Sequence, residues 1–338
     1  MKLIKNYIKN YAKYLLKFYT PDFLFKKIPK EIIIEPTNIC NLKCPVCPTS
    51  FAMTRNKGFM DFELFKSIIN EFIEYNDKPE ISMNFSGEPL LNKSIYKFIK
   101  YASDHGHNTY ISTNATAINE KNSTDMIKSG LSDIHLCIDG FSNKSHDTYR
   151  VGSDFNVIKK NIEIFLETKN KLNKKNPNVV IQTLITSLSE NEEEEMIKWA
   201  KEIGADSINF KSLSMGSYTT EDMKKKYNFL LPKNKNLRRK QTVYFKSVCT
   251  IPYHQSVIYW NGNLGLCCID FNNKVSMPNI RKDGFIKTLL SKDVIKARKK
   301  GFQKKYDICT NCSLGNADFM GTNKSFSQKE NIDKPNLV

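Results

Sequence analysis

The stretch IIIEPTNICNLKCPVCP (residues 32–48) places three cysteines, Cys40, Cys44 and Cys47, directly after an apolar, strand-like run. Three thiolates on one loop can hold three irons of a cubane iron–sulfur cluster and leave the fourth iron without a protein ligand. Electron-transfer ferredoxins close that position with a fourth cysteine. An open position on a metal is where a reaction can take place, as in catalytic zinc sites. The spacing therefore favours a catalytic cluster, although a zinc site or half of a ferredoxin-type cluster also uses close cysteines.

Size and composition are those of a soluble globular protein. The chain has 338 residues, 40% of them hydrophobic and 26% charged, which is enough for one large domain and a smaller one. No uninterrupted apolar stretch approaches the roughly 20 residues that span a bilayer, and lysines interrupt the N-terminal apolar runs. We therefore expect a cytoplasmic protein. Nine cysteines in such a chain favour metal binding over a disulfide framework.

The formal charge of +17 raises the question of a nucleic-acid partner. Only six of the 52 basic residues are arginines, and the lysines are spread along the whole chain, as a compositional bias would spread them. Lysines on solvated helix faces need no partner, so we do not expect a nucleic-acid substrate. A basic surface would still help to dock an acidic electron donor such as a flavodoxin or a ferredoxin.

Residues 1–30 form a basic N-terminal segment. Between residues 1 and 20, apolar side chains recur at helical spacing with lysines between them, which predicts an amphipathic helix that ends at Pro21. Such a helix can lie on a membrane surface or pack against the main domain. We expect the packed arrangement.

Strand and helix signals alternate from residue 31 to residue 213, which predicts an α/β fold of repeated βα units around a parallel sheet. Right-handed crossovers would place the helices on one face and curl the sheet toward a barrel. Barrel active sites lie at the C-terminal ends of the strands, which is where the cysteine loop follows the first strand. The expected strands are Glu31–Glu35, Ile81–Phe85, Thr109–Thr113, Asp133–Ile138, Val179–Thr186 and Ser207–Lys211, and the expected helices lie near Phe62–Tyr75, Ser94–His105, Ser123–Ser129, Val157–Leu172 and Glu192–Ile203.

The alternation ends after residue 213. Residues 214–245 are polar and lysine-rich, which predicts a linker with one short helix. Residues 246–320 hold the remaining cysteines in a smaller domain, where Asn261-Gly262 between two apolar runs predicts a β-hairpin. Residues 321–338 are polar, and we expect a disordered tail.

Polar residues follow several of the expected strands. Ser86-Gly87-Glu88-Pro89 follows the second strand, Ser112-Thr113-Asn114 ends the third, and the fourth ends at Cys137-Ile138-Asp139. A carboxylate at a strand end can accept hydrogen bonds from an ammonium group, and short polar side chains can bind ribose hydroxyls or a carboxylate. These groups would share one rim with the cysteine loop.

These features together resemble the radical S-adenosylmethionine (radical SAM) enzymes, which carry the CxxxCxxC motif. The resemblance implies a partial (β/α)6 barrel in which Cys40, Cys44 and Cys47 hold a [4Fe–4S] cluster, and the methionine end of SAM chelates the open iron. One electron from the cluster then cleaves SAM to a 5′-deoxyadenosyl radical, which takes a hydrogen atom from the substrate.

The resemblance also implies a set of SAM-binding residues. Residues 86–89 match the family's GGEP motif, with serine in place of the first glycine, and would lie at the amino group of SAM. Arg150 matches a position that pairs with the SAM carboxylate, a task that suits the guanidinium fork; a surface arginine is the alternative. Leu184 would pack on the adenine or belong to the core, and Cys137 stands where the family usually has serine. The whole set is Gly87, Glu88, Pro89, Ser112, Asn114, Asp139, Arg150 and Leu184.

A second group of cysteines resembles the SPASM and twitch extensions of radical SAM enzymes. These extensions hold auxiliary [4Fe–4S] clusters, and the twitch arrangement of one auxiliary cluster would use Cys249, Cys267, Cys309 and Cys312. Cys268 is the alternative to Cys267, and zinc is the alternative metal. Asp270 is a candidate catalytic base, because sulfatase-maturating relatives have an aspartate just after the equivalent cysteine.

The resemblance therefore implies a radical SAM oxidoreductase with two [4Fe–4S] clusters and SAM as cofactors. Only about 30 residues precede the first motif strand, too few for an appended peptide-recognition domain, so we expect the net oxidation of a small hydroxylated metabolite or sugar. A maturase that modifies a peptide or protein side chain is the alternative. A non-catalytic iron–sulfur electron carrier and a zinc-stapled nucleic-acid-binding protein are the alternatives from other classes.

Overall fold

The computed structural model describes residues 21–213, 215–216, 218–238, 248–310, 312 and 325–327. The expected N-terminal amphipathic helix lies outside these residues, as does most of the expected tail. In the part of the chain that the structure describes, no helix has the length and apolar character needed to cross a bilayer.

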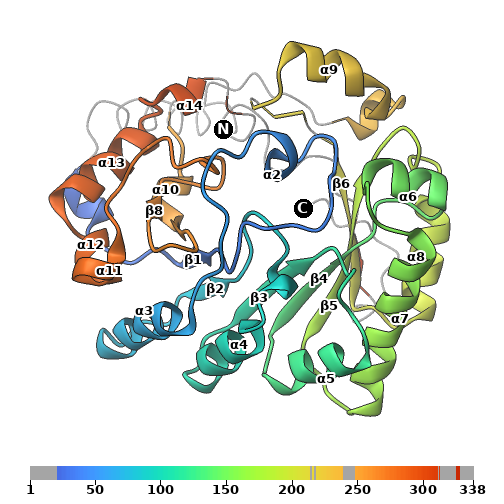
Figure 1. The fold of residues 1–338 in the computed structure, drawn as a ribbon, viewed down its shortest axis with the longest axis horizontal. Helices are drawn as coiled ribbons and strands as arrows, with labels where there is room; N and C mark the ends of the chain where they lie inside the picture. Colours follow the sequence, from blue (N-terminus) through green and yellow to red (C-terminus); the bar gives the residue numbers. More distant parts are fainter. Residues whose placement is uncertain are drawn as a thin grey trace, which may run out of the picture.

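One nine-stranded sheet organises the molecule, in the order β8-β7-β1-β2-β3-β4-β5-β6-β9 (Figure 1). The strands from β7 to β6 in that order are parallel, and β8 and β9 pair antiparallel at the two edges. The strands are β1 (Glu31–Ile34), β2 (Glu80–Ser82), β3 (Thr109–Thr113), β4 (Asp133–Cys137), β5 (Asn178–Ile185), β6 (Ser207–Ser212), β7 (Gln255–Ile258), β8 (Leu264–Gly265) and β9 (Ser325–Ser327).

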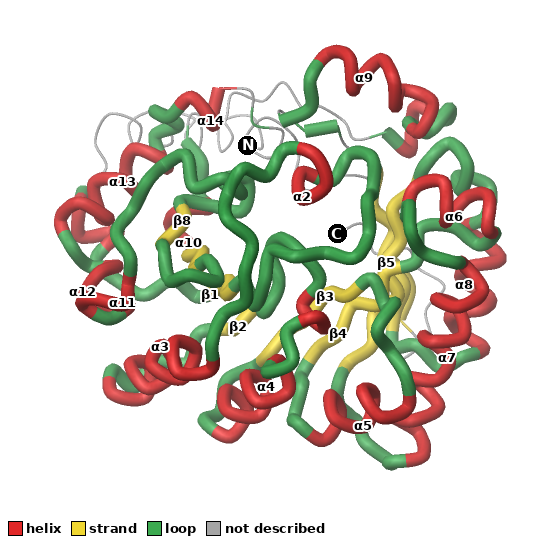
Figure 2. The backbone as a smooth tube through the Cα atoms, in the orientation of Figure 1, coloured by secondary structure: helices red, strands yellow, loops and turns green. Residues whose placement is uncertain are grey.

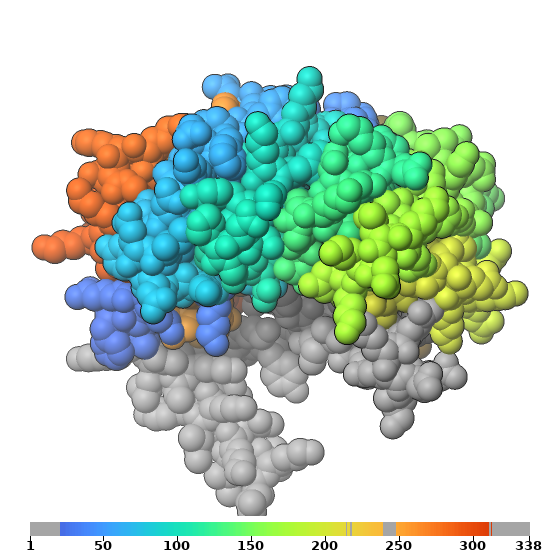
Figure 3. Space-filling model, turned by 90° about the horizontal axis from the view of Figure 1, so that it is seen from below, coloured from blue at the N-terminus to red at the C-terminus, as the bar shows by residue number. Residues whose placement is uncertain are grey.

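Helices cover the outer side of this curved sheet, and the loop that follows β1 lies inside the arc (Figures 1 and 2). In the space-filling view of Figure 3, the described segments form a continuous outer wall. The helices are α2 (Pro48–Phe51), α3 (Phe62–Glu74), α4 (Ile95–Asp104), α5 (Glu120–Lys128), α6 (Asn143–Tyr149), α7 (Phe155–Lys171), α8 (Glu193–Glu202), α9 (Glu221–Tyr227), α10 (Ile251–His254), α11 (Ile280–Asp283), α12 (Phe285–Leu289), α13 (Lys292–Phe302) and α14 (Asp307–Thr310), with 3-10 turns η1 (Asp22–Phe25), η2 (Pro89–Leu91), η3 (Asn228–Leu230) and η4 (Lys235–Leu237).

Side-chain alternation gives each central strand two different faces. In β6, Ile208 and Phe210 are buried in the main hydrophobic core, whereas Asn209 and Lys211 between and after them lie on the other face and are only partly buried. Successive side chains of a strand point to opposite sides. The helix-covered outer face of the sheet is therefore apolar, and its inner face carries polar side chains.

The α/β architecture expected from the sequence is confirmed. All six expected strands are present with ends shifted by at most a few residues, and the five expected helices correspond to α3, α4, α5, α7 and α8. The second strand ends at Ser82, so the Gly87-Glu88 motif lies on a loop that leads into η2. Helix α6, which the sequence analysis did not identify, begins at a capping box formed by Ser142 and Ser145 and ends just before Arg150.

The C-terminal hairpin is present as β7 and β8, but it is not a separate sheet. Strand β7 pairs in parallel with β1, with Ile34 opposite Ile258, so the C-terminal region extends the barrel sheet beyond its first strand. The linker contains α9 with two 3-10 turns. One short segment of the expected tail, β9, pairs antiparallel with β6.

Candidate active site

The loop that carries Cys40, Cys44 and Cys47, here called the cluster loop (residues 40–47), is held against the turn that follows β2. The backbone N–H of Glu88 donates to the carbonyl of Ile39, 2.8 Å away. Gly87 has a φ of +77°, and a Cβ there would lie 2.6 Å from the carbonyl oxygens of Thr37 and Ile39. Only glycine allows both this φ and this close approach, so Gly87 fixes the start of the cluster loop.

The three cysteines of the cluster loop line one cavity of about 370 Å³. This volume lies in the range of small-molecule sites, which is roughly 300–1,000 Å³. The cavity is also lined by polar residues from the ends and inner faces of β3, β4, β5 and β6. Among its lining residues are Gly87, Glu88, Ser112, Thr113, Asn114, Cys137 and Arg150, together with Asn84, Tyr110, Gln182 and Lys211. The structure thus brings most of the predicted SAM-binding residues to one site.

Glu88 is buried and its carboxylate is already engaged by the chain. One oxygen accepts from the Leu90 N–H (3.1 Å) and the Thr113 hydroxyl (2.7 Å), and the other accepts from the Asn114 N–H (2.8 Å). Burial raises the pKa of Glu88, and these three donors oppose that rise. The carboxylate therefore ties the turn after β2 to the end of β3. Its expected contact with the amino group of SAM stays a prediction.

Asn114 is buried and links the end of β3 to the cluster loop. Its side-chain NH₂ donates to the Asn41 side-chain oxygen (3.0 Å) and lies 3.9 Å from the sulfur of Cys40. Its own side-chain oxygen accepts from the N–H (3.0 Å) and hydroxyl (2.6 Å) of Thr116. These contacts make Asn114 a positioning residue for the loop, and a contact with SAM would have to replace one of them.

Arg150 and Asp139 form an ion pair at the wall of the cavity. The Nε of Arg150 donates to one oxygen of Asp139, whose other oxygen accepts from the Leu184 N–H at 2.7 Å. Among the described residues, no hydrogen bond engages the two terminal nitrogens of Arg150. Asp139 raises the pKa of Arg150 well above its ordinary value, although burial opposes this. The arginine is therefore a fixed cation with a fork available for a carboxylate.

Of the two residues Leu184 and Cys137, only Cys137 lines the cavity of the cluster loop. Leu184 packs with Leu42, Cys44 and other apolar residues beneath the cluster loop and is not among the residues that line the cavity. Its expected contact with adenine stays a prediction. Cys137 lines the cavity from β4, where its sulfur lies 3.3 Å from the Ser112 hydroxyl and 3.5 Å from the Gln182 side-chain nitrogen.

Several residues of the cavity wall were missed by the sequence analysis, among them Asn84 after β2 and three residues on the strands. Tyr110, Gln182 and Lys211 lie on the inner faces of β3, β5 and β6 and line the cavity. The signal available in the sequence was a polar residue at alternate positions of an otherwise apolar strand. Such a residue faces either solvent or a barrel interior, and the sequence pattern alone does not distinguish them.

Cys249, Cys267, Cys309 and Cys312, here called the C-terminal cysteine set, line a second and much smaller cavity of about 20 Å³. Its other lining residues are mostly apolar, among them Ile251, Pro252, Leu266 and Ile308. Cys268 does not line it and instead packs with Ile33, Val257, Tyr259 and Phe85. After burial, the charges of Cys312 and Cys249 also raise the pKa of Cys268, so Cys268 lies near the set as well, and the choice of Cys267 as its fourth member stays a prediction.

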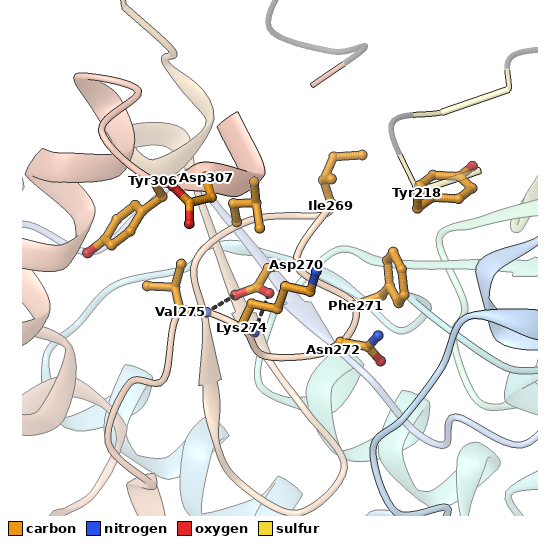
Figure 4. Close-up of a pocket in the computed structure, with 10 residues that line it drawn as sticks. Tyr218, Ile269, Asp270, Phe271, Asn272, Lys274, Val275, Tyr306 and Asp307 are labelled. Carbon is orange, nitrogen blue, oxygen red and sulfur yellow. Dashed lines mark hydrogen bonds between the residues drawn. The ribbon is translucent and has the colours of Figure 1, made fainter. Parts of the chain in front are cut away.

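Asp270 lies outside the cavity of the cluster loop. It is buried, and its two carboxylate oxygens accept from the backbone N–H groups of Lys274 (2.6 Å) and Val275 (3.1 Å), as Figure 4 shows. It lines a different cavity of about 350 Å³, together with Tyr218 and Asp307 among others. These contacts are those of a structural acceptor that closes its own loop, so a role as catalytic base stays a prediction without support from this geometry.

A buried ion pair joins the segment after the cluster loop to the C-terminal region. Both terminal nitrogens of Arg55 donate to the fully buried carboxylate of Glu35, at 2.6 and 2.9 Å, and its Nε donates to the carbonyl of Phe271 at 2.6 Å. The guanidinium also lies 4.1 Å from the ring centre of Tyr259. One arginine thus holds β1 and the loop after Cys267 in fixed relation.

The chemistry of both cysteine sets fits iron–sulfur clusters. Burial raises the pKa of the Cys44 thiol to about 12, so this thiol is protonated at neutral pH until a metal replaces the proton. Three thiols beside a polar cavity and a free guanidinium fork suit a cluster that shares its site with a charged cofactor. Four thiols around a mostly apolar cavity suit a cluster that is ligated only by protein. At about 20 Å³ the cavity has room for about one water molecule, so it would have to widen to hold a cubane.

Two family profiles match this chain. That of the radical SAM superfamily matches residues 34–200, and that of the SPASM iron–sulfur cluster-binding domain matches residues 249–313. The chain belongs to the radical SAM superfamily. Its cofactors are SAM and two iron–sulfur clusters, and it carries a C-terminal SPASM domain.

The sequence similarity to two curated relatives extends over only part of this chain. The PqqA peptide cyclase of Bradyrhizobium diazoefficiens is 26% identical over 138 residues, 40% of this chain and 35% of that protein. The S-adenosyl-L-methionine-dependent 2-deoxy-scyllo-inosamine dehydrogenase of Niallia circulans is 30% identical over 79 residues, 23% of this chain and 32% of that protein. The chain thus matches about a third of the length of each.

The fold is similar to that of BtrN, whose crystal structure was solved in complex with AdoMet and 2-DOIA. The TM-score is 0.53 at 20% identity, over 85% of this chain and 93% of that chain. A likeness at this identity concerns the fold alone.

Proposed function

We propose that this radical SAM enzyme oxidises a small hydroxylated metabolite or sugar by two electrons. The observation that carries the proposal is the cavity of about 370 Å³, which joins the cluster loop to a polar inner wall inside the barrel. A polar wall of this kind suits a substrate rich in hydroxyl groups, because hydroxyls need hydrogen-bonding partners once they leave water. The similarity to the dehydrogenase of Niallia circulans supports the same reading.

When bound, the cluster and SAM supply a 5′-deoxyadenosyl radical that takes a hydrogen atom from the substrate. The protein positions both partners and excludes water. Cys40, Cys44 and Cys47 would hold the cluster, and the fork of Arg150, fixed by Asp139, would hold the SAM carboxylate. Glu88 keeps the turn after β2 and the end of β3 together beside them.

The C-terminal cysteine set supports an oxidation rather than a redox-neutral rearrangement. Its four thiols would leave no iron open, so substrate could not bind there, and the small apolar cavity leaves little room for substrate. We propose electron transfer as the role of this site, and a purely structural cluster is the alternative. Removing one hydrogen atom from an alcohol and then one electron and one proton gives a carbonyl, so the products would be the oxidised substrate, 5′-deoxyadenosine and methionine.

A maturase that modifies a peptide is the second candidate. The observation that favours it is the longer match, over 138 residues, to the PqqA peptide cyclase of Bradyrhizobium diazoefficiens. Either reaction needs an electron donor, and the charge of +17 supports an acidic flavodoxin or ferredoxin in that role. We also propose that the protein acts in the cytoplasm.

The test is product analysis with the protein reconstituted without oxygen. With SAM and a reductant, we expect 5′-deoxyadenosine to form. With metabolite fractions as substrate, we expect a small product two mass units lighter than its precursor, with one 5′-deoxyadenosine formed per product. A product of unchanged mass would exclude the oxidation, and a modified peptide as the product would favour the maturase. Absence of 5′-deoxyadenosine under all conditions would contradict the enzyme class itself.

A further inference from the structure

The inner wall of the cavity carries a hydrogen-bonded chain of side chains that the reaction described above does not use. It runs across four neighbouring strands, from Tyr110 on β3 through His135 on β4 and Gln182 on β5 to Lys211 on β6. The Tyr110 hydroxyl lies 3.1 Å from Nδ1 of His135, and this nitrogen lies 3.0 Å from the Gln182 oxygen. Nζ of Lys211 donates to the same oxygen at 2.5 Å.

This chain holds the ammonium group of Lys211 in one place. Gln182 is fixed at both ends of its amide, because its oxygen is shared by His135 and Lys211 and its nitrogen lies 3.5 Å from the sulfur of Cys137. Lys211 lines the cavity together with Gln182 and Tyr110. A long lysine side chain that is already ordered loses little further freedom when a ligand binds.

The local charges leave Lys211 without a countercharge. Its hydrogen-bond partner is a neutral amide, and no carboxylate among the described residues lies in ion-pair contact with it. Burial lowers the pKa of Lys211, and the carboxylate whose charge opposes this is Asp139. Both oxygens of Asp139 are engaged, by Arg150 and by the Leu184 N–H. The other cavity carboxylate, Glu88, accepts three hydrogen bonds elsewhere.

His135 adds no charge to this wall. Burial lowers the pKa of His135 to about 4, so its ring is neutral at physiological pH. With its hydrogen on Nδ1, the histidine donates to the Gln182 oxygen, which orients the amide, and the Tyr110 hydroxyl can share that hydrogen only as an acceptor. A partly buried cation whose neighbours are neutral gains from an anionic ligand, because a charge removed from water is costly unless it is paired.

We infer that Lys211 binds an acidic group of the substrate, a carboxylate or a phosphate, and that the substrate is therefore an acidic hydroxylated metabolite. This inference rests on the proposed function and narrows its substrate class. Arg150 is the cation placed for the carboxylate of SAM, beside the cluster loop. Lys211 lines the same cavity from β6 and supplies a second cation there.

The test measures anion binding to the reconstituted protein loaded with SAM, by isothermal titration without oxygen. The probes are inorganic phosphate and acetate, with glycerol as a neutral control. Lys211→Met removes the cation at nearly constant length, and Gln182→Glu keeps the lysine but places a carboxylate beside it. Lys198→Met, at a lysine whose side chain is 79% exposed on α8, is the matched control.

We expect the wild-type protein and Lys198→Met to bind one of the two anions with the same affinity. Lys211→Met and Gln182→Glu should each bind it at least tenfold more weakly, the size of effect expected for a lost charged hydrogen bond. Preference for phosphate or acetate identifies the acidic group. Iron content shows whether each variant is folded, and having two variants keeps the comparison possible if one of them is not.

Three results would overturn the inference: no anion binding by the wild-type protein, equal binding by Lys211→Met, or undiminished binding by Gln182→Glu. Equal binding by Lys211→Met would mean that the amine has another role in the wall. The proposed function is tested separately by 5′-deoxyadenosine formation in the wild-type protein. A protein that cleaves SAM but binds neither anion would lose this inference and keep its enzyme class.

Discussion

The two cysteine sites of this protein differ in almost every physical respect. The cluster loop presents three cysteines within eight residues to a cavity of about 370 Å³ with polar walls. The C-terminal cysteine set gathers four cysteines from residues 249 to 312 around a cavity of about 20 Å³ with mostly apolar walls. One site has space and polar groups for further ligands, and the other has neither.

Under the proposed function, this difference separates a site for reaction from a site for electron transfer. A cluster with three protein ligands can exchange its remaining ligand, as catalytic zinc sites do, whereas a fully ligated one can only gain or lose electrons. The residues that line the two cavities are consistent with this difference in the number of protein ligands. Around the cluster loop, Arg150 and Lys211 line the cavity with positive charges, while the residues that line the second site are mostly apolar.

The largest effect expected is from removing the cluster loop's thiols. The triple variant Cys40→Ala/Cys44→Ala/Cys47→Ala should lose reductive cleavage of SAM entirely, because thiolates are the groups that attach the cluster to this loop. About four irons per chain should remain, those of the second cubane. Both quantities are measured after reconstitution, by chromatography of 5′-deoxyadenosine and by iron analysis.

Cys137→Ser is the control for this variant. Cys137 lines the same cavity but lies on β4 beside Ser112 and Gln182, so its loss should leave the iron content at about eight per chain. Continued SAM cleavage in the triple variant, or a loss of about four irons in Cys137→Ser, would contradict the assignment of the three ligands.

The second prediction separates two adjacent cysteines. Cys267→Ser should lose the auxiliary cluster, because Cys267 lines the small cavity with the other three cysteines. Cys268→Ser should keep it, because Cys268 is not among the residues that line this cavity. Iron and sulfide analysis of the pair measures this directly. The opposite result would assign the fourth ligand to Cys268, and we expect SAM cleavage to continue in both variants.

The barrel could be predicted from the sequence because its signals are local. Alternating strands and helices, Gly87 at a tight turn and three cysteines after β1 are each visible in a short window of sequence. The parallel pairing of β7 with β1 could not be predicted, because it joins Ile34 to Ile258. A hairpin signal defines two strands and not the edge on which they dock.

The polar wall was missed for a related reason. Tyr110, His135, Gln182 and Lys211 lie up to about a hundred positions apart, and they meet only because the registers of β3 to β6 align them. Likewise, the sequence left Cys268 as an alternative to Cys267, since the direction in which two neighbouring side chains point is not visible in their spacing. Asp270 was a candidate base because of its position after the cysteine pair. In the structure, both of its carboxylate oxygens accept backbone hydrogen bonds.

The third prediction concerns the ion pair that connects the two regions. Arg55→Ala leaves the fully buried Glu35 without its cation, and breaking a buried pair in this way costs about 3–5 kcal/mol of unfolding free energy. Chemical denaturation measures the loss. The exposed pair of Arg281 and Asp61 is the control, and Arg281→Ala should cost no more than about 1 kcal/mol.

The loss in Arg55→Ala should also depend on pH. Burial raises the pKa of Glu35 in the folded protein above its ordinary value of 4.5, and removing Arg55 should raise it further. The folded state then binds more protons than the unfolded state between the two pKa values, so stability falls as the pH rises through that interval. The variant should regain stability when the pH is lowered toward 4.5. A loss that is small, or independent of pH, would show that Glu35 does not depend on Arg55.

The smallest effect expected is on SAM affinity, at the cation beside the cluster loop. Arg150→Ala should weaken SAM binding about tenfold or more, since a buried charged hydrogen bond left unmade costs on the order of 1.5–3 kcal/mol. Arg150→Lys keeps the charge but not the fork, and its affinity for SAM should fall between those of the wild-type protein and Arg150→Ala.

Equilibrium binding to the reconstituted protein measures all three affinities, with Arg281→Ala as the exposed control. Arg150→Ala also leaves the buried Asp139 without its cation, and this lowers the stability of the fold for the same reason as in Arg55→Ala. Binding is therefore compared under conditions in which denaturation curves show that each variant is folded. An unchanged dissociation constant for Arg150→Ala would mean that the fork faces the cavity without binding SAM. The charges at this site would then serve the substrate alone.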